Sequence, residues 1–241
     1  MKVALVCVAK NEDNYIQEWI NYYLKLGFDD IFIYENDWRC SIEQNNVHKI
    51  PFDGYNMQET SYNNFIQTYH NEYDWAAFFD VDEFLVLKKH ADIKEFVSDY
   101  SKYNSIGINW VLFGDNELSF DGNYSVLSRF TKRQFAVNEH VKSIVKMNPM
   151  IEYQIHQPKN CEVVDPNFNI FTGPFNQMGH DNIAQINHYF CKTWDEWQNK
   201  KNRGRADVPF GNDAHFRPDS HFHQHNFNEI EDTSALDFYL S

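Results

Sequence analysis

The chain has 241 residues, of which 42% are hydrophobic and 17% aromatic, enough for one sizeable core and hence for one domain. Its 21 Lys and Arg stand against 35 Asp and Glu, and the formal charge of −14 argues against nucleic acid or an anionic membrane surface as a broad binding partner. With nine Gly and seven Pro, the chain is not of low complexity.

The first half alternates between strands and helices. Strands are expected at 3–9, 31–34, 47–50, 75–79 and 105–112, and helices at about 13–26, 58–71 and 92–103. The first helix shows apolar residues at helical spacing and has Gly27 just after its end. Asp92 and Glu95 have the spacing of a capping box. The alternation predicts an α/β sandwich whose ligand crevice lies beyond the carboxyl ends of the strands.

The second half is less regular. Strands are expected at 141–147, 152–156, 161–164 and 183–191, with mixed or antiparallel pairing, and one helix at 193–202. We expect a main domain over 1–210 and a His-rich, acidic tail over 211–241 that packs on or beside it. The alternating His221, His223 and His225 fit an exposed, metal-binding strand, but a mobile tail is the favoured interpretation.

The apolar runs and the cysteines indicate the cellular compartment. The run at 3–9 is too short for a secretory signal, and no later run approaches the ~20 residues that cross a bilayer. The four cysteines are widely spaced without a Cys-x-x-Cys pair, so we expect reduced structural thiols. Both features predict a cytoplasmic protein without a transmembrane segment.

The sharpest local signal is a pair of carboxylates after the strand at 75–79. Asp80 and Asp82 are two residues apart, so continued strand alternation would place both on one side, with Val81 opposed. Two adjacent carboxylates repel, and Mg²⁺ or Mn²⁺ bridging them to a phosphate relieves that repulsion. The alternative is an acidic turn that caps the following helix.

Polar residues also follow the first two strands. Lys10, Asn11, Glu12 and Asp13 end the first strand, and the segment 35–37 (Glu-Asn-Asp) ends the second. Together with Asp80 and Asp82 they describe a crevice for a nucleoside diphosphate, with amides for the base, a carboxylate for the ribose and a metal for the phosphates. Asn11 or Asp13 serves equally well as a helix cap.

Five segments together resemble a known family. They are Val-Ala-Leu-Val-Cys-Val-Ala-Lys-Asn-Glu at 3–12, Asp-Val-Asp-Glu-Phe at 80–84, Asn-Trp-Val-Leu-Phe-Gly at 109–114, Val-Lys-Ser-Ile-Val at 141–145, and His-Tyr at 188–189 before Lys200, Arg203, Gly204 and Asp207. In order and spacing they resemble GT-A glycosyltransferases of the family 2 and family 92 type, from residue 3 to about 207. The resemblance implies a Rossmann-like GT-A sandwich with a mostly parallel mixed sheet.

The same resemblance implies an enzyme that moves a sugar from a nucleotide-diphospho-sugar, usually a uridine one, to a glycan hydroxyl. Inversion at the anomeric carbon is preferred, and Mn²⁺ or Mg²⁺ is the expected cofactor. The expected acceptor is a surface polysaccharide or a lipid-linked sugar, which allows peripheral contact with a membrane. Nucleic acid is not an expected partner.

Carried over to this sequence, the resemblance places Asn11 and Glu12 near the nucleotide and Asn36 near the base or ribose. It places Asp80 and Asp82 on the ribose and the metal. His188 matches a His that completes the metal site, although a satisfied core histidine explains it almost as well.

The basic residues after His188 suggest a clamp on the diphosphate leaving group. Lys192, Lys200, Arg203 and Arg205 form the one dense basic cluster of this acidic sequence. The solvated face of a helix is an equal alternative.

A catalytic base is not assigned, because the Gly-x-x-Glu-Asp signature of family 2 is missing. Asp115, Glu117, Glu139 and Asp181 are candidates, and each also fits an ordinary surface acid.

Two rival functions stay open at this point. A metal-dependent nucleotidyltransferase or phosphohydrolase would use Asp80, Asp82 and His188 on phosphorus instead of carbon. A carbohydrate-binding protein without catalysis would use exposed Tyr and Trp rings as stacking surfaces.

Overall fold

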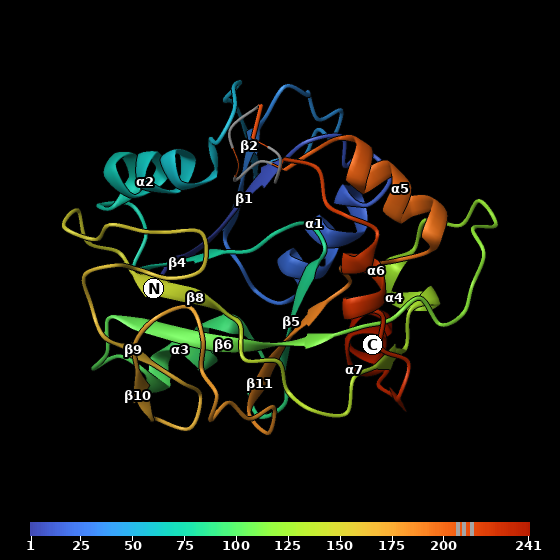
Figure 1. Cartoon of the computed structure of the whole chain (residues 1–241). Coiled ribbons are helices and arrows are strands. Elements are labelled where there is room, and N and C mark those ends of the chain that lie inside the picture. The colour runs from blue at the N-terminus through green and yellow to red at the C-terminus, as the bar shows by residue number, and fades with distance from the viewer. Residues whose placement is uncertain (206–207, 209–210, 213–214) are drawn as a thin grey trace.

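A computed structural model describes residues 1–205, 208, 211–212 and 215–241. A twisted sheet runs through the molecule with helices on both sides (Figure 1). Its strands are β1 (Val3–Ala9), β2 (Asp30–Glu35), β3 (Val47–Pro51), β4 (Trp75–Phe78), β5 (Glu83–Leu87), β6 (Ser105–Leu112), β8 (Val141–Lys146), β9 (Val163–Val164), β10 (Ile170–Phe171) and β11 (Ala184–His188). The main path is β10-β9-β6-β8-β4-β1-β2-β3, and β11 joins β5 to β6.

The N-terminal half of this sheet is parallel. β1 pairs in parallel with β2 and β4, and β2 pairs in parallel with β3. Side chains of β1 alternate between two cores: Leu5 and Cys7 pack with helix α1 (Ile16–Lys25), and Ala4 and Val6 pack with helix α2 (Gln58–Tyr69). Because both faces are covered, every position of β1 can be apolar, as the sequence has it.

The C-terminal half has mixed pairing, as predicted. β8 lies between β4 and β6 and is antiparallel to both, whereas β11 is parallel to β6 and antiparallel to β5. The class is therefore α/β with a central, mostly parallel mixed sheet in a single domain, which confirms the expected fold class.

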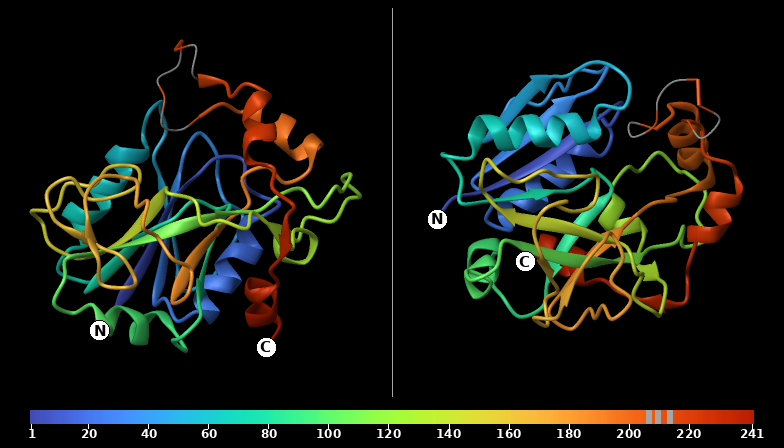
Figure 2. Two further views of the ribbon diagram at one scale, coloured as in Figure 1. Left: turned by 60° about the horizontal axis from the view of Figure 1, so that its bottom comes forward. Right: turned by 60° about the vertical axis from the view of Figure 1, so that its left-hand side comes forward.

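Shorter elements complete the chain. They are α3 (Ile93–Asp99), α4 (Val126–Arg129), β7 (Lys132–Arg133), α5 (Trp194–Asn202), α6 (Ser220–His225), β12 (Ile230–Glu231) and α7 (Ser234–Leu240). β12 pairs with β7, and Ala235 of α7 is part of the larger core (Figure 2). The predicted boundary at residue 210 lies outside the described residues and stays a prediction.

Several predicted elements differ from the structure. Residues 83–87 form the strand β5, which the alternation missed because it begins within the acidic segment 80–83, five residues after the end of β4. The expected strand at 152–156 is wrong: only an isolated bridge between Tyr153 and Pro158 is present. The expected helix at 92–103 ends at Asp99. The expected His-rich mobile tail is also wrong at 220–225, because this segment is the helix α6 and buries Phe222 against Trp197.

The described chain contains no helix with the length and apolar character needed to cross a bilayer. All four cysteines are free thiols, and Cys7, Cys40 and Cys191 are buried.

Candidate active site

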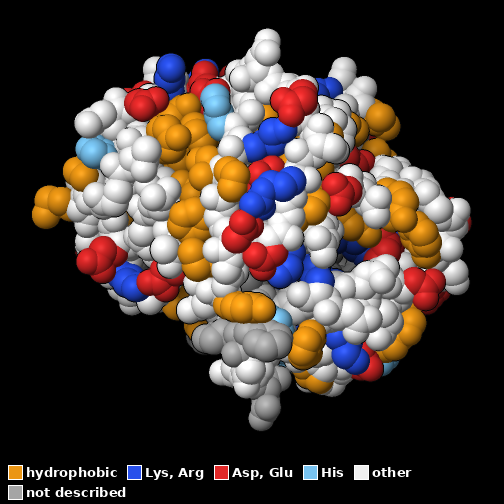
Figure 3. All heavy atoms as spheres, turned by 90° about the horizontal axis from the view of Figure 1, so that it is seen from above, with side chains coloured by type: hydrophobic (Ala, Val, Ile, Leu, Met, Phe, Trp, Pro, Cys, Tyr) orange, Lys and Arg blue, Asp and Glu red, His pale blue; other side chains and the backbone are white. Residues whose placement is uncertain are grey.

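A cavity of about 330 Å³ opens beyond the carboxyl ends of β1 and β4. Its walls come from the β1–α1 and β4–β5 connections, from β11, and from α5 and α6 with the segments next to them. Seen from above in Figure 3, this face has Lys and Arg side chains interspersed among Asp and Glu near its centre. The cavity is lined, among others, by Lys10, Glu12, Gln58, Asp80, Asp82, Trp110, His140, His156, His188, Lys200, Arg203, Arg205, Arg217, His221 and His225. It lies where the α/β alternation predicts a ligand crevice.

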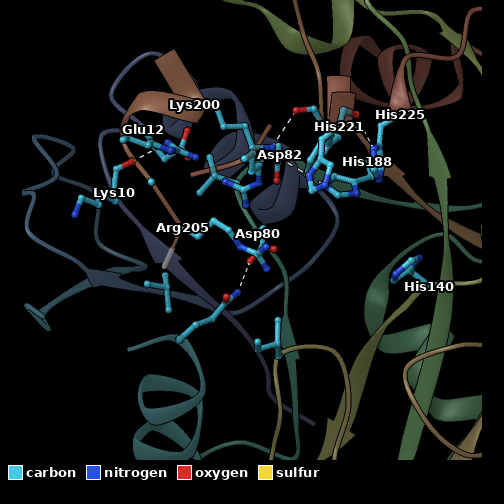
Figure 4. Close-up of a pocket in the computed structure, with 18 of the residues that line it drawn as sticks. Lys10, Glu12, Asp80, Asp82, His140, His188, Lys200, Arg205, His221 and His225 are labelled. Atoms are coloured by element: carbon cyan, nitrogen blue, oxygen red, sulfur yellow. Dashed lines mark hydrogen bonds and ion pairs between the residues drawn. The ribbon is translucent and has the colours of Figure 1, made fainter. Parts of the chain in front are cut away.

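Asp82 is the best-buried carboxylate of the predicted pair. It lies in the turn between β4 and β5, so strand alternation is not what aims it, and Val81 also lines the cavity. Its Oδ2 atom accepts a hydrogen bond from Lys200 Nζ at 2.5 Å and lies 3.7 Å from His188 Nε2 (Figure 4). Burial alone would raise the pKa of Asp82, but Lys200, His188 and Lys192 together outweigh it and hold the pKa well below its usual range. Asp82 is therefore a carboxylate that stays ionised.

Asp80 lines the same cavity but has different partners. Its Oδ1 atom accepts a hydrogen bond from Gln58 Nε2 at 2.9 Å, and its Oδ2 atom accepts one from Lys142 Nζ at 3.0 Å. Lys142 is completely buried and also lies 3.6 Å from Glu83, another completely buried residue. Burial raises the pKa of Glu83, although Lys142 opposes that shift. These contacts fix the orientation of Asp80.

Gln58 and Lys142 were not predicted to serve the site. Lys142 belongs to the Val-Lys-Ser-Ile-Val segment at 141–145, where a lysine interrupts an otherwise buried strand. A buried lysine needs a carboxylate partner, so this interruption is the signal that sequence reasoning had available and did not use.

His188 is placed close to Asp82, at the end of β11, as its position in the sequence suggested. It is 5% exposed, packs against Trp110 with ring centroids 4.3 Å apart, and its Nδ1 atom is buried without a hydrogen-bond partner. Burial lowers the pKa of His188 to about 4, so its imidazole is neutral at pH 7. The interpretation as a satisfied core histidine does not fit a ring with an unpartnered nitrogen.

The predicted nucleotide ligands are only partly brought together. Glu12 lines the cavity and forms an ion pair with Arg203, which also donates to the carbonyl of Lys10 at 2.8 Å. Asn11 lines a neighbouring cavity instead. Asn36 lines neither, and its amide nitrogen donates to the carbonyls of Phe52 and Gly54. The roles given to Asn11 and Asn36 stay predictions.

The basic cluster is not a solvated helix face. The side chain of Lys200 is 10% exposed and that of Arg203 is 23% exposed, and each is paired with a carboxylate of the cavity. Burial lowers the pKa of Lys200 to about 8, although Asp82 opposes it. Arg205 lines the same cavity, whereas Lys192 lines the neighbouring one. Asp207 lies outside the described residues.

None of the four candidate bases lines either of these two cavities. Asp181 is paired with Lys88 and Arg133, and Asp115 accepts a hydrogen bond from Asn228. Glu117 and Glu139 are exposed. The base stays unassigned.

The helix α6 brings further histidines to the site. His221 and His225 lie beside His188 on one side of Asp82, and Lys10 and Glu12 lie on the other side (Figure 4). The sequence analysis favoured a mobile tail over an exposed strand for this segment. In the structure Phe222 of α6 packs instead with Cys191 and Trp197 in a small apolar cluster, and His221 and His225 line the cavity.

Comparisons with known proteins decide the family. The model of glycosyltransferase family 92 matches residues 3–224. The chain belongs to glycosyltransferase family 92. This confirms the resemblance drawn from its motifs.

Among curated relatives, the chain is 24% identical to a family 92 protein of Arabidopsis thaliana, over 96% of this chain and 45% of that protein. It is 27% identical to one of Ricinus communis, over 96% of this chain and 44% of that protein. The chain thus spans less than half the length of these relatives. Among solved structures, residues 1–349 of S. aureus TarS are 16% identical with a TM-score of 0.36, over 61% of this chain and 47% of that one, a similarity too weak to extend to function.

Proposed function

We propose that this family 92 chain transfers a sugar from a nucleotide-diphospho-sugar, most simply a uridine one, to a hydroxyl of a glycan or lipid-linked sugar, with inversion. The observation that carries the proposal is one cavity that gathers Asp80, Asp82, His188, Lys200 and Arg203 at the carboxyl ends of β1 and β4. Carboxylates and a neutral imidazole suit a divalent cation, and the cations suit phosphate.

A divalent metal fits the chemistry of these side chains. Asp82 is ionised, His188 is neutral with an unpartnered nitrogen, and Asp80 lines the same cavity. The described residues contain no group of three such side chains placed to hold a metal ion, and Lys200 and Lys142 are hydrogen-bonded to the two carboxylates. Asp80, Asp82 and His188 would hold Mn²⁺ or Mg²⁺ once Lys200 leaves Asp82. The ion would neutralise charge on the diphosphate.

Lys200 and Arg203 would stabilise the departing diphosphate. The anomeric carbon gains oxocarbenium character as its bond to the phosphate oxygen breaks, so negative charge develops on the leaving group. At ~4 Å and an effective dielectric near 20, one ammonium and one unit of that charge interact by roughly 4 kcal/mol. A Lys200 released from Asp82 supplies such a charge, and Arg203 supplies a second one.

The experiment is a thermal-shift titration of the chain with UDP, and with the other nucleoside diphosphates, in Mn²⁺ and in EDTA. At 100-fold excess over Kd a ligand adds about 2.7 kcal/mol to the free energy of unfolding. For a chain of this length that corresponds to about 5–10 °C in Tm. We expect this shift with UDP only when Mn²⁺ is present. A carbohydrate-binding protein without catalysis would show no shift with any nucleotide.

A further inference from the structure

A second cavity of about 460 Å³ lies beside the first and shares Glu12, Lys200 and Arg203 with it. It is formed by the β1–α1 connection, the loop before α4, and α5. The other residues that line it are Asn11, Asn14, Tyr15, Phe120, Tyr124, Cys191, Lys192, Asp195, Glu196, Asn199 and Asn202. The mixture of aromatic rings and amides is typical of a site for a sugar ring.

Most charges in the wall of this second cavity are paired. Glu196 accepts two hydrogen bonds from Arg129, at 2.7 and 2.9 Å, and a third from the Tyr15 hydroxyl at 2.9 Å. Arg203 is paired with Glu12, and Lys200 with Asp82. In this structure these charges are therefore neutralised within the protein, and Lys200 and Arg203 are the two cations proposed above for the diphosphate of the donor.

Lys192 is the exception. It is 6% exposed, and in the part of the chain that the structure describes its ammonium forms neither a hydrogen bond nor an ion pair. Its one contact of note is with the ring of Tyr15, 4.5 Å from the ring centroid. Asp195 lines the same cavity but is exposed and forms no ion pair with Lys192. A buried ammonium without a hydrogen bond or an ion pair costs free energy, which an anionic ligand in the cavity would recover.

We propose that the second cavity binds an acidic sugar unit of the acceptor, with the carboxylate or phosphate of that unit on Lys192. Phe120 and Tyr124, whose ring centroids lie 4.9 Å apart, offer apolar surface to the sugar ring. The exposed amides of Asn14, Asn199 and Asn202 have no side-chain partners in the described chain and are free to bind hydroxyls. This inference rests on the proposed glycosyl transfer, because it takes the first cavity as the donor site.

The diphosphate of the donor is the alternative anion that Lys192 could bind. The sequence analysis expected this role for the basic cluster that includes Lys192. Asp80, Asp82 and His188, the groups proposed to hold the metal, all line the first cavity and not the second. A diphosphate bound on Lys192 in the second cavity would therefore not share a cavity with the proposed metal. An acidic group of the acceptor has no such requirement.

The test uses the whole chain and three probes: methyl β-D-glucuronide for a carboxylate, glucose 6-phosphate for a phosphate, and methyl β-D-glucoside as the neutral comparison. Binding is followed by NMR shifts of the chain and by calorimetry, with UDP and Mn²⁺ titrated separately. The variants are Lys192→Met, Lys192→Arg as a charge-conserving change, and Lys201→Met as a control. Lys201 is a partly exposed cation of α5, paired with Asp219.

We expect at least one acidic probe to bind at least about tenfold more tightly than the neutral glucoside, because one charge-assisted hydrogen bond contributes enough free energy for that difference in Kd. The more tightly bound acidic probe identifies the source of the anion. Lys192→Met should remove this preference, Lys192→Arg should retain part of it, and Lys201→Met should retain all of it. UDP binding should not change in any variant.

Two results would overturn the inference. One is equal binding of acidic and neutral probes to the wild-type chain. The other is a loss of UDP binding in Lys192→Met, which would give Lys192 to the donor. In both results UDP still binds the wild-type chain. A failure of the proposed glycosyl transfer is different, because UDP would then not bind the wild-type chain at all.

Discussion

Replacing Asp82 by Asn is expected to abolish Mn²⁺-dependent binding of UDP and to lower turnover by about 100- to 1000-fold. Asp82 is the ionised carboxylate of the cavity, and its charge serves either Lys200 or the proposed metal. The amide keeps the shape of the side chain but removes that charge. UDP affinity in Mn²⁺ and the rate of donor consumption measure the effect.

The same change has a structural side effect that the sequence did not predict. Lys200 is only 10% exposed, so in Asp82→Asn it loses its counter-charge inside the protein. The double variant Asp82→Asn with Lys200→Met removes one charge of each sign and leaves the net charge of the cavity unchanged. We expect it to melt near the wild-type temperature and still not to bind UDP with Mn²⁺.

The matched control is Asp99→Asn, which removes an exposed carboxylate hydrogen-bonded to His90, away from both cavities. It should leave UDP binding and turnover unchanged. Near wild-type turnover in a folded Asp82→Asn variant would contradict the metal assignment.

Replacing Lys142 by Met is expected to lower the free energy of unfolding by about 3 kcal/mol, because it breaks a buried ion pair and leaves its partners behind. Lys142 is completely buried, contacts Asp80 at 3.0 Å and lies 3.6 Å from Glu83. Without Lys142, Asp80 also loses the contact that orients it, so UDP binding should weaken. Urea unfolding measures the stability, and UDP titration in Mn²⁺ measures the binding.

The deficit of Lys142→Met should grow as pH rises from about 5 to 8. Burial raises the pKa of Glu83, and loss of Lys142 raises it further, so the native state holds a proton that the unfolded chain has already released above pH ~4.3. Stability linked to a raised carboxyl pKa is present at low pH and lost as pH rises. Adding Glu83→Gln should therefore recover part of the loss at pH 8.

Lys146→Met is the control for Lys142→Met, since Lys146 lies on the same strand β8 but is exposed and donates to the carbonyl of Ser101. We expect it to change stability by less than about 0.5 kcal/mol. Equal effects of Lys142→Met and Lys146→Met would show that the buried ion pair does not hold Asp80.

Local patterns in the sequence were enough for the framework of the fold. The bounds of β1 and β6 match the predicted strands. β1 is a continuous apolar run of the kind that a two-sided sheet requires, and β6 is buried along its whole length although it includes Ser105, Gly107 and Asn109. The end of α1 was marked by Gly27, whose φ of +95° suits glycine. The position of the cavity followed from the α/β order, and so did the presence there of Asp80 and Asp82, whereas that of His188 followed from the family resemblance.

Pairing between distant residues could not be predicted in the same way. Lys200 meets Asp82 across 118 positions, Lys142 meets Asp80 across 62, and Glu12 meets Arg203 across 191. A sequence shows a basic cluster and an acidic turn but not which cation reaches which carboxylate. Hence the sequence could not show that Lys200 and Arg203 each form an ion pair with a carboxylate whereas Lys192 forms none in the described chain.

The measurement that tests the proposed glycosyl transfer most directly is the position of the bond that breaks in the donor. UDP-sugars are incubated with the wild-type chain and Mn²⁺ in water enriched in ¹⁸O, without acceptor, so that water takes the place of the acceptor hydroxyl. Glycosyl transfer predicts free UDP without label and a sugar with ¹⁸O at its anomeric carbon, initially in the inverted configuration. Label on phosphorus, with UMP and sugar phosphate as products, would contradict the proposed function and identify a phosphohydrolase instead.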